Sequence, residues 1–320
     1  MRKIFSIICL LLVSVMAMPC TNLIVGKKAS TDGSVIISYS SDSYGMFSSL
    51  YYKPRMKHAK GTMRPIYHYE TSNYLGEIPE AEETYQVTGF LNEYQLSIME
   101  TTFGGRPELD GGPGIMDYGS LMWIALERCK TAREAIKLID ELCQKYGYQC
   151  SGESFTIADK NEVWQMEILG EGPDKIGGIW AAQRVPDDQV AVSCNVARIT
   201  TLQRNNPDYF LCSDNIEEVA MKYGCWDGQG EFVWWRAFLS DYAGGKNHTE
   251  REWYIFNQLA PSLHLELEAE ELPFSIIPEE KVSARKVMEL FRANYEGCPE
   301  VDQTANLKCP VTHYNDEGKV

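Results

Sequence analysis

The sequence predicts an α+β domain in which helices pack on antiparallel sheets. Strand patterns and helix patterns come in blocks, in the order strands, helices, strands, helices. Blocks of this kind favour helices on the faces of antiparallel sheets. The chain shows no internal repeat, low-complexity run or linker that would divide it. Its composition, 44% hydrophobic and 23% charged, is that of a globular protein.

A β-hairpin is the first expected element, within residues 20–42. Residues 21–25 are apolar and β-prone, Asp32-Gly33 supplies the turn, and residues 35–39 form the second strand. Residues 44–80 are rich in Tyr, Pro and Met without a clean period. We expect a long ordered loop region there.

Helix and strand patterns then alternate in blocks along the rest of the chain. Thr131 and Glu134 form a capping-box signature that starts one of the helices. Strands are expected at 155–158 and 163–169, and a second hairpin at 179–185 and 190–196. The expected helices are 117–129, the one that begins at 131, 216–223, 252–259 and 281–295.

The first nineteen residues have the features of a secretory signal. Arg2 and Lys3 precede an apolar stretch from residue 4 to residue 15, which is too short for a membrane span. No later stretch is long and apolar enough to cross a bilayer, so we expect an exported protein, periplasmic or extracellular, without a membrane span. Residues 15–17 fit a signal-peptidase site, which leaves Met18-Pro19 ahead of Cys20. We assign residues 1–19 to a signal peptide and short propeptide, and residues 20–320 to the domain.

The charge of the chain disfavours two classes of partner. The formal net charge is −15, and lysines and arginines do not cluster beyond two or three residues. Such a surface repels nucleic acids and anionic membranes. We therefore expect no nucleic-acid partner, while a homo-oligomer stays open.

Ten cysteines allow two interpretations. One leaves with the signal peptide and Cys20 stands apart, so eight remain, which could form four disulfides in the oxidising compartment that export implies. The alternative, which we favour, is that several are free buried thiols in a protein large enough not to need disulfides.

Cys20 stands at the signal-peptide junction and has three interpretations. It could carry a lipid, but Pro19 directly before it is a poor residue for a lipid-attachment site. It could be a structural cysteine. It could be an N-terminal nucleophile, because the α-amine of a first residue can serve as the base for its own thiol. We favour the third, and we expect the Cys20 thiol to attack the Pro19 carbonyl and remove the propeptide itself.

The other titratable residues fit a nucleophile that needs no metal or cofactor. The five histidines show no His-Glu-x-x-His pattern, so a zinc peptidase is disfavoured. If residues 23–25 pair with residues 35–37, or the turn is tight at Asp32-Gly33, Cys20 lies opposite a residue between Ser40 and Gly45. This window contains Asp42. Asp42 could hold the α-amine by a charge-assisted hydrogen bond. The alternative is an aspartate that closes a turn at the end of a strand.

Three stretches of the chain resemble the bacterial dipeptidases (dipeptidase A family) of the N-terminal-nucleophile superfamily. They are Cys20-Thr-Asn-Leu-Ile-Val-Gly-Lys-Lys-Ala-Ser-Thr-Asp-Gly-Ser34 with Ser41-Asp42-Ser43, the run 162–170, and 180–186 with 192–199. Penicillin V acylases and bile-salt hydrolases are more distant relatives. The resemblance implies a four-layer αββα sandwich and amide hydrolysis of short peptides.

The same resemblance implies roles for individual residues. Cys20 would be the nucleophile and, through its amine, the base, and Asp42 would orient that amine. Asn195 would donate to the oxyanion, with a second contact near Thr102, and Arg198 would bind a substrate carboxylate. Tyr39 takes the place of an arginine in many relatives and offers a hydrogen bond without a permanent charge.

The resemblance also leaves alternatives open. The relatives are longer, so this chain is expected to lack their C-terminal part. A linear-amide acylase would use the same fold and nucleophile. A non-enzymatic secreted or lipid-anchored binding protein would use neither.

Overall fold

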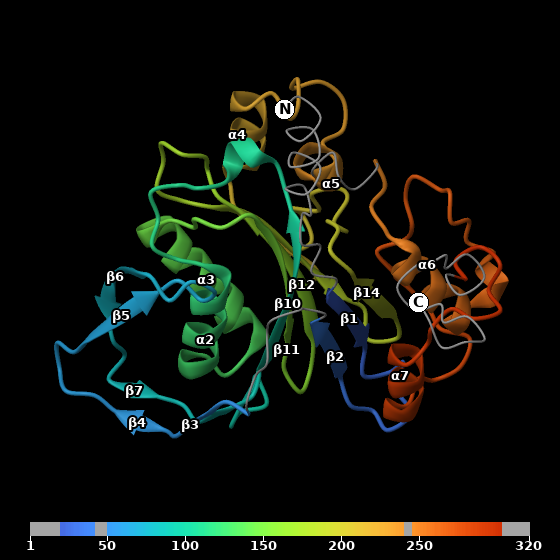
Figure 1. Ribbon diagram of the computed structural model, residues 1–320, viewed down its shortest axis with the longest axis horizontal. Helices are drawn as coiled ribbons and strands as arrows, with labels where there is room; N and C mark the ends of the chain where they lie inside the picture. Colours follow the sequence, from blue (N-terminus) through green and yellow to red (C-terminus); the bar gives the residue numbers. More distant parts are fainter. Residues whose placement is uncertain (1–19, 42–49, 240–244, 303–320) are drawn as a thin grey trace, which may run out of the picture.

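Two antiparallel β-sheets lie face to face in the computed structural model, which describes residues 20–41, 50–239 and 245–302 (Figure 1). The smaller sheet has the strand order β16-β14-β1-β2. Its strands are β1 (Cys20–Val25), β2 (Ile36–Ser41), β14 (Val190–Ser193) and β16 (Ser275–Ile276). The expected hairpin at the start of the chain is therefore confirmed, since β1 pairs with β2.

The larger sheet has the strand order β15-β13-β12-β11-β10-β9-β8-β3. Its strands are β3 (Tyr52–Lys53), β8 (Val87–Thr88), β9 (Leu91–Asn92), β10 (Ser97–Gly104), β11 (Gly152–Ala158), β12 (Val163–Leu169), β13 (Ile179–Val185) and β15 (Phe210–Cys212). All residues of β11 and β12 are buried, because one face of the sheet meets helices and the other meets the smaller sheet. Two small sheets add β4 (Met56–Lys57) with β7 (Glu83–Thr84), and β5 (Met63–Tyr67) with β6 (Tyr74–Pro79).

Helices cover the outer faces of both sheets, so that Figure 1 shows four layers. Helices α2 (Tyr118–Arg128) and α3 (Ala132–Tyr146) pack on the larger sheet. Helices α6 (Glu250–Leu259) and α7 (Ala284–Phe291) pack on the smaller sheet. The expectation of an α+β domain with antiparallel sheets is confirmed, and the order of layers is helix, sheet, sheet, helix.

Sequence patterns explain these helices. Thr131 accepts a hydrogen bond from the backbone of Glu134 and so caps α3, as expected, and the apolar side chains of α3 recur on one buried face. Thr249 and Glu252 form a complete capping box at the start of α6. The remaining short helices are α4 (Ile216–Lys222), α5 (Trp234–Phe238), η1 (Pro107–Leu109) and η3 (Pro261–Leu263).

Two expectations about local structure are wrong. Residues 179–196 were expected to form a hairpin, but β13 belongs to the larger sheet and β14 to the smaller one. The turn at 186–189 therefore carries the chain from one sheet to the other. Residues 44–80 were expected to be loop, yet the described part contains four short strands, among them the pair β5 and β6.

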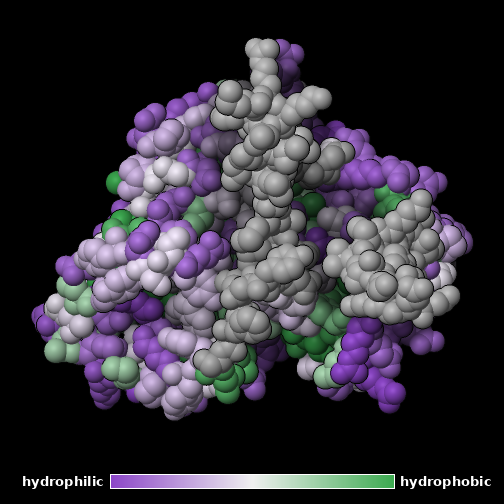
Figure 2. Space-filling view, in the orientation of Figure 1, coloured by the Kyte–Doolittle hydropathy of each residue, from purple (hydrophilic) through white to green (hydrophobic). Residues whose placement is uncertain are grey.

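The described cysteines are free thiols, Cys20 included, as the favoured interpretation expected; Cys309 lies outside the described residues. Hydrophilic residues predominate on the face shown in Figure 2, apart from the atoms drawn in grey, in keeping with the formal net charge of −15. Among the helices of residues 20–41, 50–239 and 245–302, none combines the length and the apolar character needed to cross a bilayer.

Candidate active site around Cys20

Cys20 is the first residue of β1 and is almost fully buried, with 3% of its surface exposed. Strand β1 lies between β2 and β14 in the smaller sheet. The register pairs Cys20 with Ser41, inside the window between Ser40 and Gly45 that the sequence predicted. Asp42 follows directly and lies outside the described residues.

Asn195 holds the backbone nitrogen of Cys20. The Cys20 N–H donates to the Asn195 Oδ1 at 2.7 Å, and the Asn195 Nδ2 donates to the carbonyl oxygen of Thr102 at 2.8 Å. Asn195 lies just beyond β14 with φ +62°, a left-handed conformation that asparagine tolerates better than most residues. Because an amide nitrogen carries two hydrogens, the contact with Thr102 uses one of the two N–H donors of Asn195.

Arg251 is a member of the site that the sequence reasoning missed. Its Nη1 donates to the carbonyl oxygen of Cys20 at 2.6 Å and to the Asn195 Oδ1 at 3.2 Å. Its Nη2 donates to the carbonyl oxygen of Cys194 at 2.9 Å. One planar guanidinium therefore joins the start of β1 to the end of β14.

The position of Arg251 in its helix carried a weak signal. It lies in the first turn of α6, where a positive charge opposes the helix dipole and acidic residues are usual. The capping box of Thr249 and Glu252 marks that helix end in the sequence. Nothing in the local pattern links Arg251 to Cys20, which is 231 residues earlier.

Tyr39 and Ser41 approach the sulfur from β2. The Cys20 Sγ lies 4.0 Å from the Tyr39 hydroxyl and 4.0 Å from the Ser41 Oγ. The Tyr39 hydroxyl donates a short hydrogen bond to the Glu100 Oε1. A polar chain therefore runs from the sulfur to Glu100, a buried carboxyl group of β10.

The pKa of the Cys20 thiol is raised to about 11. Burial is the larger cause and the negative charge of Glu100 the next, while the contact with Ser41 and the charge of Arg251 act in the opposite direction. In the 320-residue chain the nitrogen of Cys20 is a peptide nitrogen, joined to Pro19. Because its pKa is raised, the Cys20 thiol of this chain is protonated at neutral pH.

Arg198 and Thr102 have other partners than those expected. Arg198 is fully buried, and its guanidinium donates to the carbonyl oxygens of Asn247 and Pro273. Burial lowers the pKa of this guanidinium. This placement gives no support to the expectation that Arg198 binds a substrate carboxylate, because its terminal nitrogens already meet backbone oxygens. The Thr102 Oγ1 donates to the Glu153 Oε2 at 3.0 Å, so Thr102 belongs to the network around the site.

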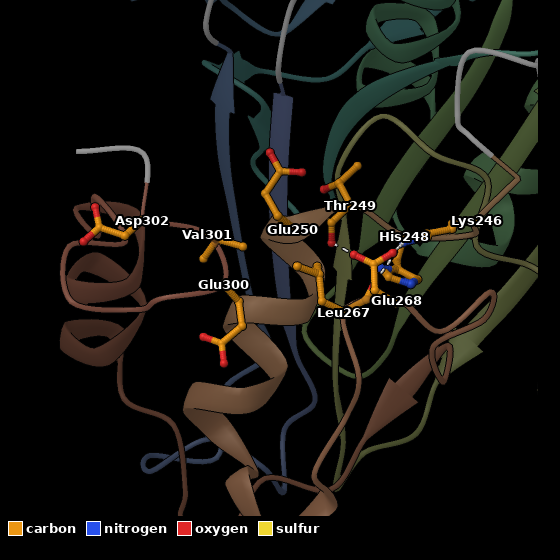
Figure 3. A pocket seen from close by; sticks show the side chains of 9 residues that line it. All are labelled: Lys246, His248, Thr249, Glu250, Leu267, Glu268, Glu300, Val301 and Asp302. Atoms are coloured by element: carbon orange, nitrogen blue, oxygen red, sulfur yellow. Dashed lines mark hydrogen bonds and ion pairs between the residues drawn. The ribbon is translucent and has the colours of Figure 1, made fainter. Parts of the chain in front are cut away.

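A pocket of about 430 Å³ lies at the start of α6, next to the helix turn that carries Arg251 (Figure 3). Its lining includes Glu250 and Glu300, and Lys246 pairs with Glu268 at 2.6 Å. Cys20 does not line this pocket. In the part of the chain that the structure describes, no group of three or more His, Cys, Asp or Glu side chains is arranged to hold a metal ion.

Comparisons with known proteins identify a family and several relatives that match most of the chain. The profile of peptidase family C69 matches residues 19–72 and 54–312, a range that begins just before Cys20. A probable dipeptidase of Latilactobacillus sakei is 28% identical over 302 residues, which are 86% of this chain and 60% of that protein. A probable dipeptidase of Salmonella dublin is 28% identical, over 87% of this chain and 67% of that protein. A dipeptidase of Bifidobacterium longum is 26% identical, over 88% of this chain and 60% of that protein.

The chain thus spans 60% of the length of two of these relatives and 67% of the third.

Proposed function

Since this chain belongs to peptidase family C69, we propose that it is an exported cysteine dipeptidase with Cys20 as its N-terminal nucleophile. One observation carries the proposal. The nitrogen, carbonyl oxygen and sulfur of Cys20 are each contacted by a different polar group, namely Asn195, Arg251 and the Tyr39–Ser41 edge of β2. A structural cysteine at a strand end does not require such an arrangement.

Maturation is the first proposed step. The Cys20 sulfur attacks the Pro19 carbonyl carbon, the C–N bond of that peptide breaks, and the thiol proton goes to the released amine. Water then hydrolyses the thioester and frees the propeptide. The step turns a neutral peptide nitrogen into an amine with a pKa of about 8 beside a thiol that the unprocessed chain keeps protonated.

Peptide hydrolysis repeats the same chemistry on a substrate. The α-amine takes the thiol proton, the thiolate attacks the peptide carbonyl, and the leaving amine receives that proton. A thioester remains, and water resolves it. We propose that the second amide hydrogen of Asn195 donates to the oxyanion, a contact that is typically worth about 10²–10³ in rate. Asp42, next along the chain from Ser41, is proposed to hold the amine.

Arg251 has a positioning role in this proposal. It touches the carbonyl oxygen of Cys20 and the Oδ1 of Asn195, so it fixes the nucleophile relative to the proposed oxyanion donor. The four layers of the fold support an N-terminal-nucleophile hydrolase sandwich, and residues 1–19 support export. Dipeptides are the proposed substrates because the relatives are named dipeptidases.

A substrate panel tests the proposal. The purified protein should hydrolyse unblocked dipeptides faster than N-acyl amides of the penicillin V type. Cys20→Ala should abolish this activity, and Cys20→Ser should retain a small part, since a hydroxyl can use the same amine. The control is Cys225→Ser, which replaces a partly exposed thiol that donates a hydrogen bond to the Tyr223 carbonyl. Hydrolysis confined to N-acyl amides, or full activity in Cys20→Ala, would contradict the proposal.

A further inference from the structure

Two buried carboxyl groups lie behind the Cys20 sulfur. Tyr39 stands 4.0 Å from the Sγ and donates its hydroxyl hydrogen to the Glu100 Oε1. Glu153 is close enough to Glu100 that, in addition to burial, the negative charge of Glu100 raises the pKa of the Glu153 carboxyl group. Their exposed fractions are 8% for Glu100 and 1% for Glu153.

The same pair connects to the nitrogen of Cys20. Glu153 accepts from the Thr102 Oγ1 at 3.0 Å, and the Thr102 carbonyl accepts from the Asn195 Nδ2 at 2.8 Å. Asn195 closes the ring by accepting from the Cys20 N–H at 2.7 Å. The contacts therefore start at the sulfur of Cys20, pass through both carboxyl groups and return to its nitrogen.

The surroundings of the two carboxyl groups favour a proton on one of them. Glu100 Oε2 and Glu153 Oε1 are buried and have no hydrogen-bond partner among the described residues. Two ionised carboxylates in contact repel each other, so such a pair holds one proton between them over a wide pH range. The pKa values of both groups are raised, in each case first by burial, and that of Glu153 also by the charge of Glu100.

The other titratable groups around the pair do not neutralise its charge. Glu70 lies near Glu100 and adds a negative charge, while Tyr118 donates to the Glu70 Oε1 at 2.9 Å. The titratable neighbours that act on the pair, or on which it acts, come from five parts of the chain. They are Cys20 of β1, Tyr39 of β2, Tyr69 and Glu70 of the segment after β5, Tyr118 of α2, and Tyr148 and Cys150 of the segment between α3 and β11.

We propose that Glu100, paired with Glu153, is a positioning residue that acts through Tyr39 and sets the protonation state of the Cys20 nucleophile. The inference rests on the proposed function, because it assumes that Cys20 is the nucleophile. A tyrosine has one hydroxyl hydrogen. While Glu100 carries the charge, that hydrogen points to Glu100, and Tyr39 can only accept a hydrogen bond from the thiol.

The pair therefore favours the thiol over the thiolate. When Glu100 loses its charge, the Tyr39 hydrogen can turn to the sulfur and stabilise the thiolate. Tyr39 thus changes from an acceptor to a donor toward Cys20, depending on one proton. The effect of Tyr39 on the thiol should accordingly reverse its sign when Glu100 is neutralised.

A double-mutant cycle measures this reversal. The pKa of the Cys20 thiol is obtained from the iodoacetamide alkylation rate between pH 6 and pH 11, with each site followed by peptide mass spectrometry and Cys225 as the internal reference. Glu100→Gln should lower the thiol pKa by about one unit, which is about tenfold faster alkylation at a pH below both values. Tyr39→Phe should raise the thiol pKa in the Glu100→Gln background but not in the parent.

Two further variants are controls. Glu70→Gln removes a negative charge near Glu100 without touching Tyr39, so it should shift the thiol pKa less than Glu100→Gln does. Glu153→Gln removes the second ionisable carboxyl group, so the negative charge of the pair stays on Glu100. This variant should therefore not lower the thiol pKa. Glu153→Gln also keeps the inference testable if circular dichroism shows that Glu100→Gln does not fold.

Three results would overturn the inference: an unchanged or raised thiol pKa in Glu100→Gln, an equal effect of Tyr39→Phe in both backgrounds, or a lowered thiol pKa in Glu153→Gln. Alkylation does not need a peptide substrate. Absence of dipeptide hydrolysis by the parent protein would therefore contradict the proposed function without affecting the double-mutant cycle. A failure of the proposed function can thus be distinguished from a failure of this inference.

Discussion

Arg251 offers a direct test of how the site is held together. Its guanidinium donates to the carbonyl oxygens of Cys20 and Cys194 and to the Asn195 Oδ1, at 2.6, 2.9 and 3.2 Å. Hydrogen bonds from a charged donor contribute about 1.5–3 kcal/mol each when buried, and less at this partly exposed residue. With about 1 kcal/mol for each contact, Arg251→Gln should lower the free energy of unfolding by about 3 kcal/mol.

The same substitution should affect turnover beyond its effect on stability. Release of the Cys20 carbonyl lets the nucleophile move relative to Asn195, and displacements of this kind cost about 10²-fold in rate. Arg251→Lys keeps the charge but loses the planar fork, so it should recover little of that rate. Urea unfolding measures the effect on stability. Dipeptide hydrolysis, assayed without urea at a temperature at which every variant is folded, measures the effect on turnover.

Arg285→Gln is the matched control, because Arg285 is an exposed helical arginine whose ion pair is with Glu289 of the same helix. It should change neither unfolding nor turnover appreciably. Arg251 has no positioning role if Arg251→Gln unfolds at the same urea concentration as Arg285→Gln and hydrolyses dipeptides at the same rate.

Two other predictions concern Glu167, which is buried in β12, and Asn195, which lies just beyond β14. Burial raises the pKa of Glu167 to about 7, against a value of about 4.3 in the unfolded chain. The protonated Glu167 carboxyl group therefore contributes its full stability below about pH 4.3, and this contribution is lost as the pH rises through about 7. Urea titrations at pH 5 and pH 8 should show a smaller loss of unfolding free energy in Glu167→Gln than in the parent, and an equal loss would contradict the assignment. Asn195→Asp keeps the acceptor for the Cys20 nitrogen but loses both amide hydrogens, so dipeptide hydrolysis should fall about 10²–10³-fold with the fold intact; a fall of less than threefold by steady-state kinetics would remove Asn195 from the oxyanion role.

The sequence predicted the parts of the site that depend on neighbouring residues. The turn at Asp32-Gly33 and two apolar runs determine the first hairpin, and its register places Cys20 opposite Ser41 as expected. A capping box with an apolar face likewise marked α3, and the helices expected at 117–129 and 252–259 match α2 and α6. Asn195 follows a strand that lies next to β1, and its place beside Cys20 depends on that pairing.

Contacts between distant residues were beyond such reasoning. Arg251 reaches Cys20 only because α6 packs on the smaller sheet, which no local pattern records. Glu100 and Glu153 belong to strands whose residues are mostly buried, and only the folded sheet brings Glu100 behind Tyr39. The run 179–196 has the residue pattern of a hairpin. The same turn residues can join two strands of one sheet or two strands of different sheets, so the pattern did not show that β13 and β14 belong to different sheets.

The identity of the first residue of the mature protein tests the central claim most directly. Intact-mass measurement of the purified protein should give a chain that begins at Cys20 without a lipid. Cys20→Ala should instead keep Met18-Pro19, because its propeptide has no thiol to attack it. A catalytically active protein that retains Met18-Pro19 ahead of Cys20 would contradict the account, since the α-amine that it needs as a base would never be free.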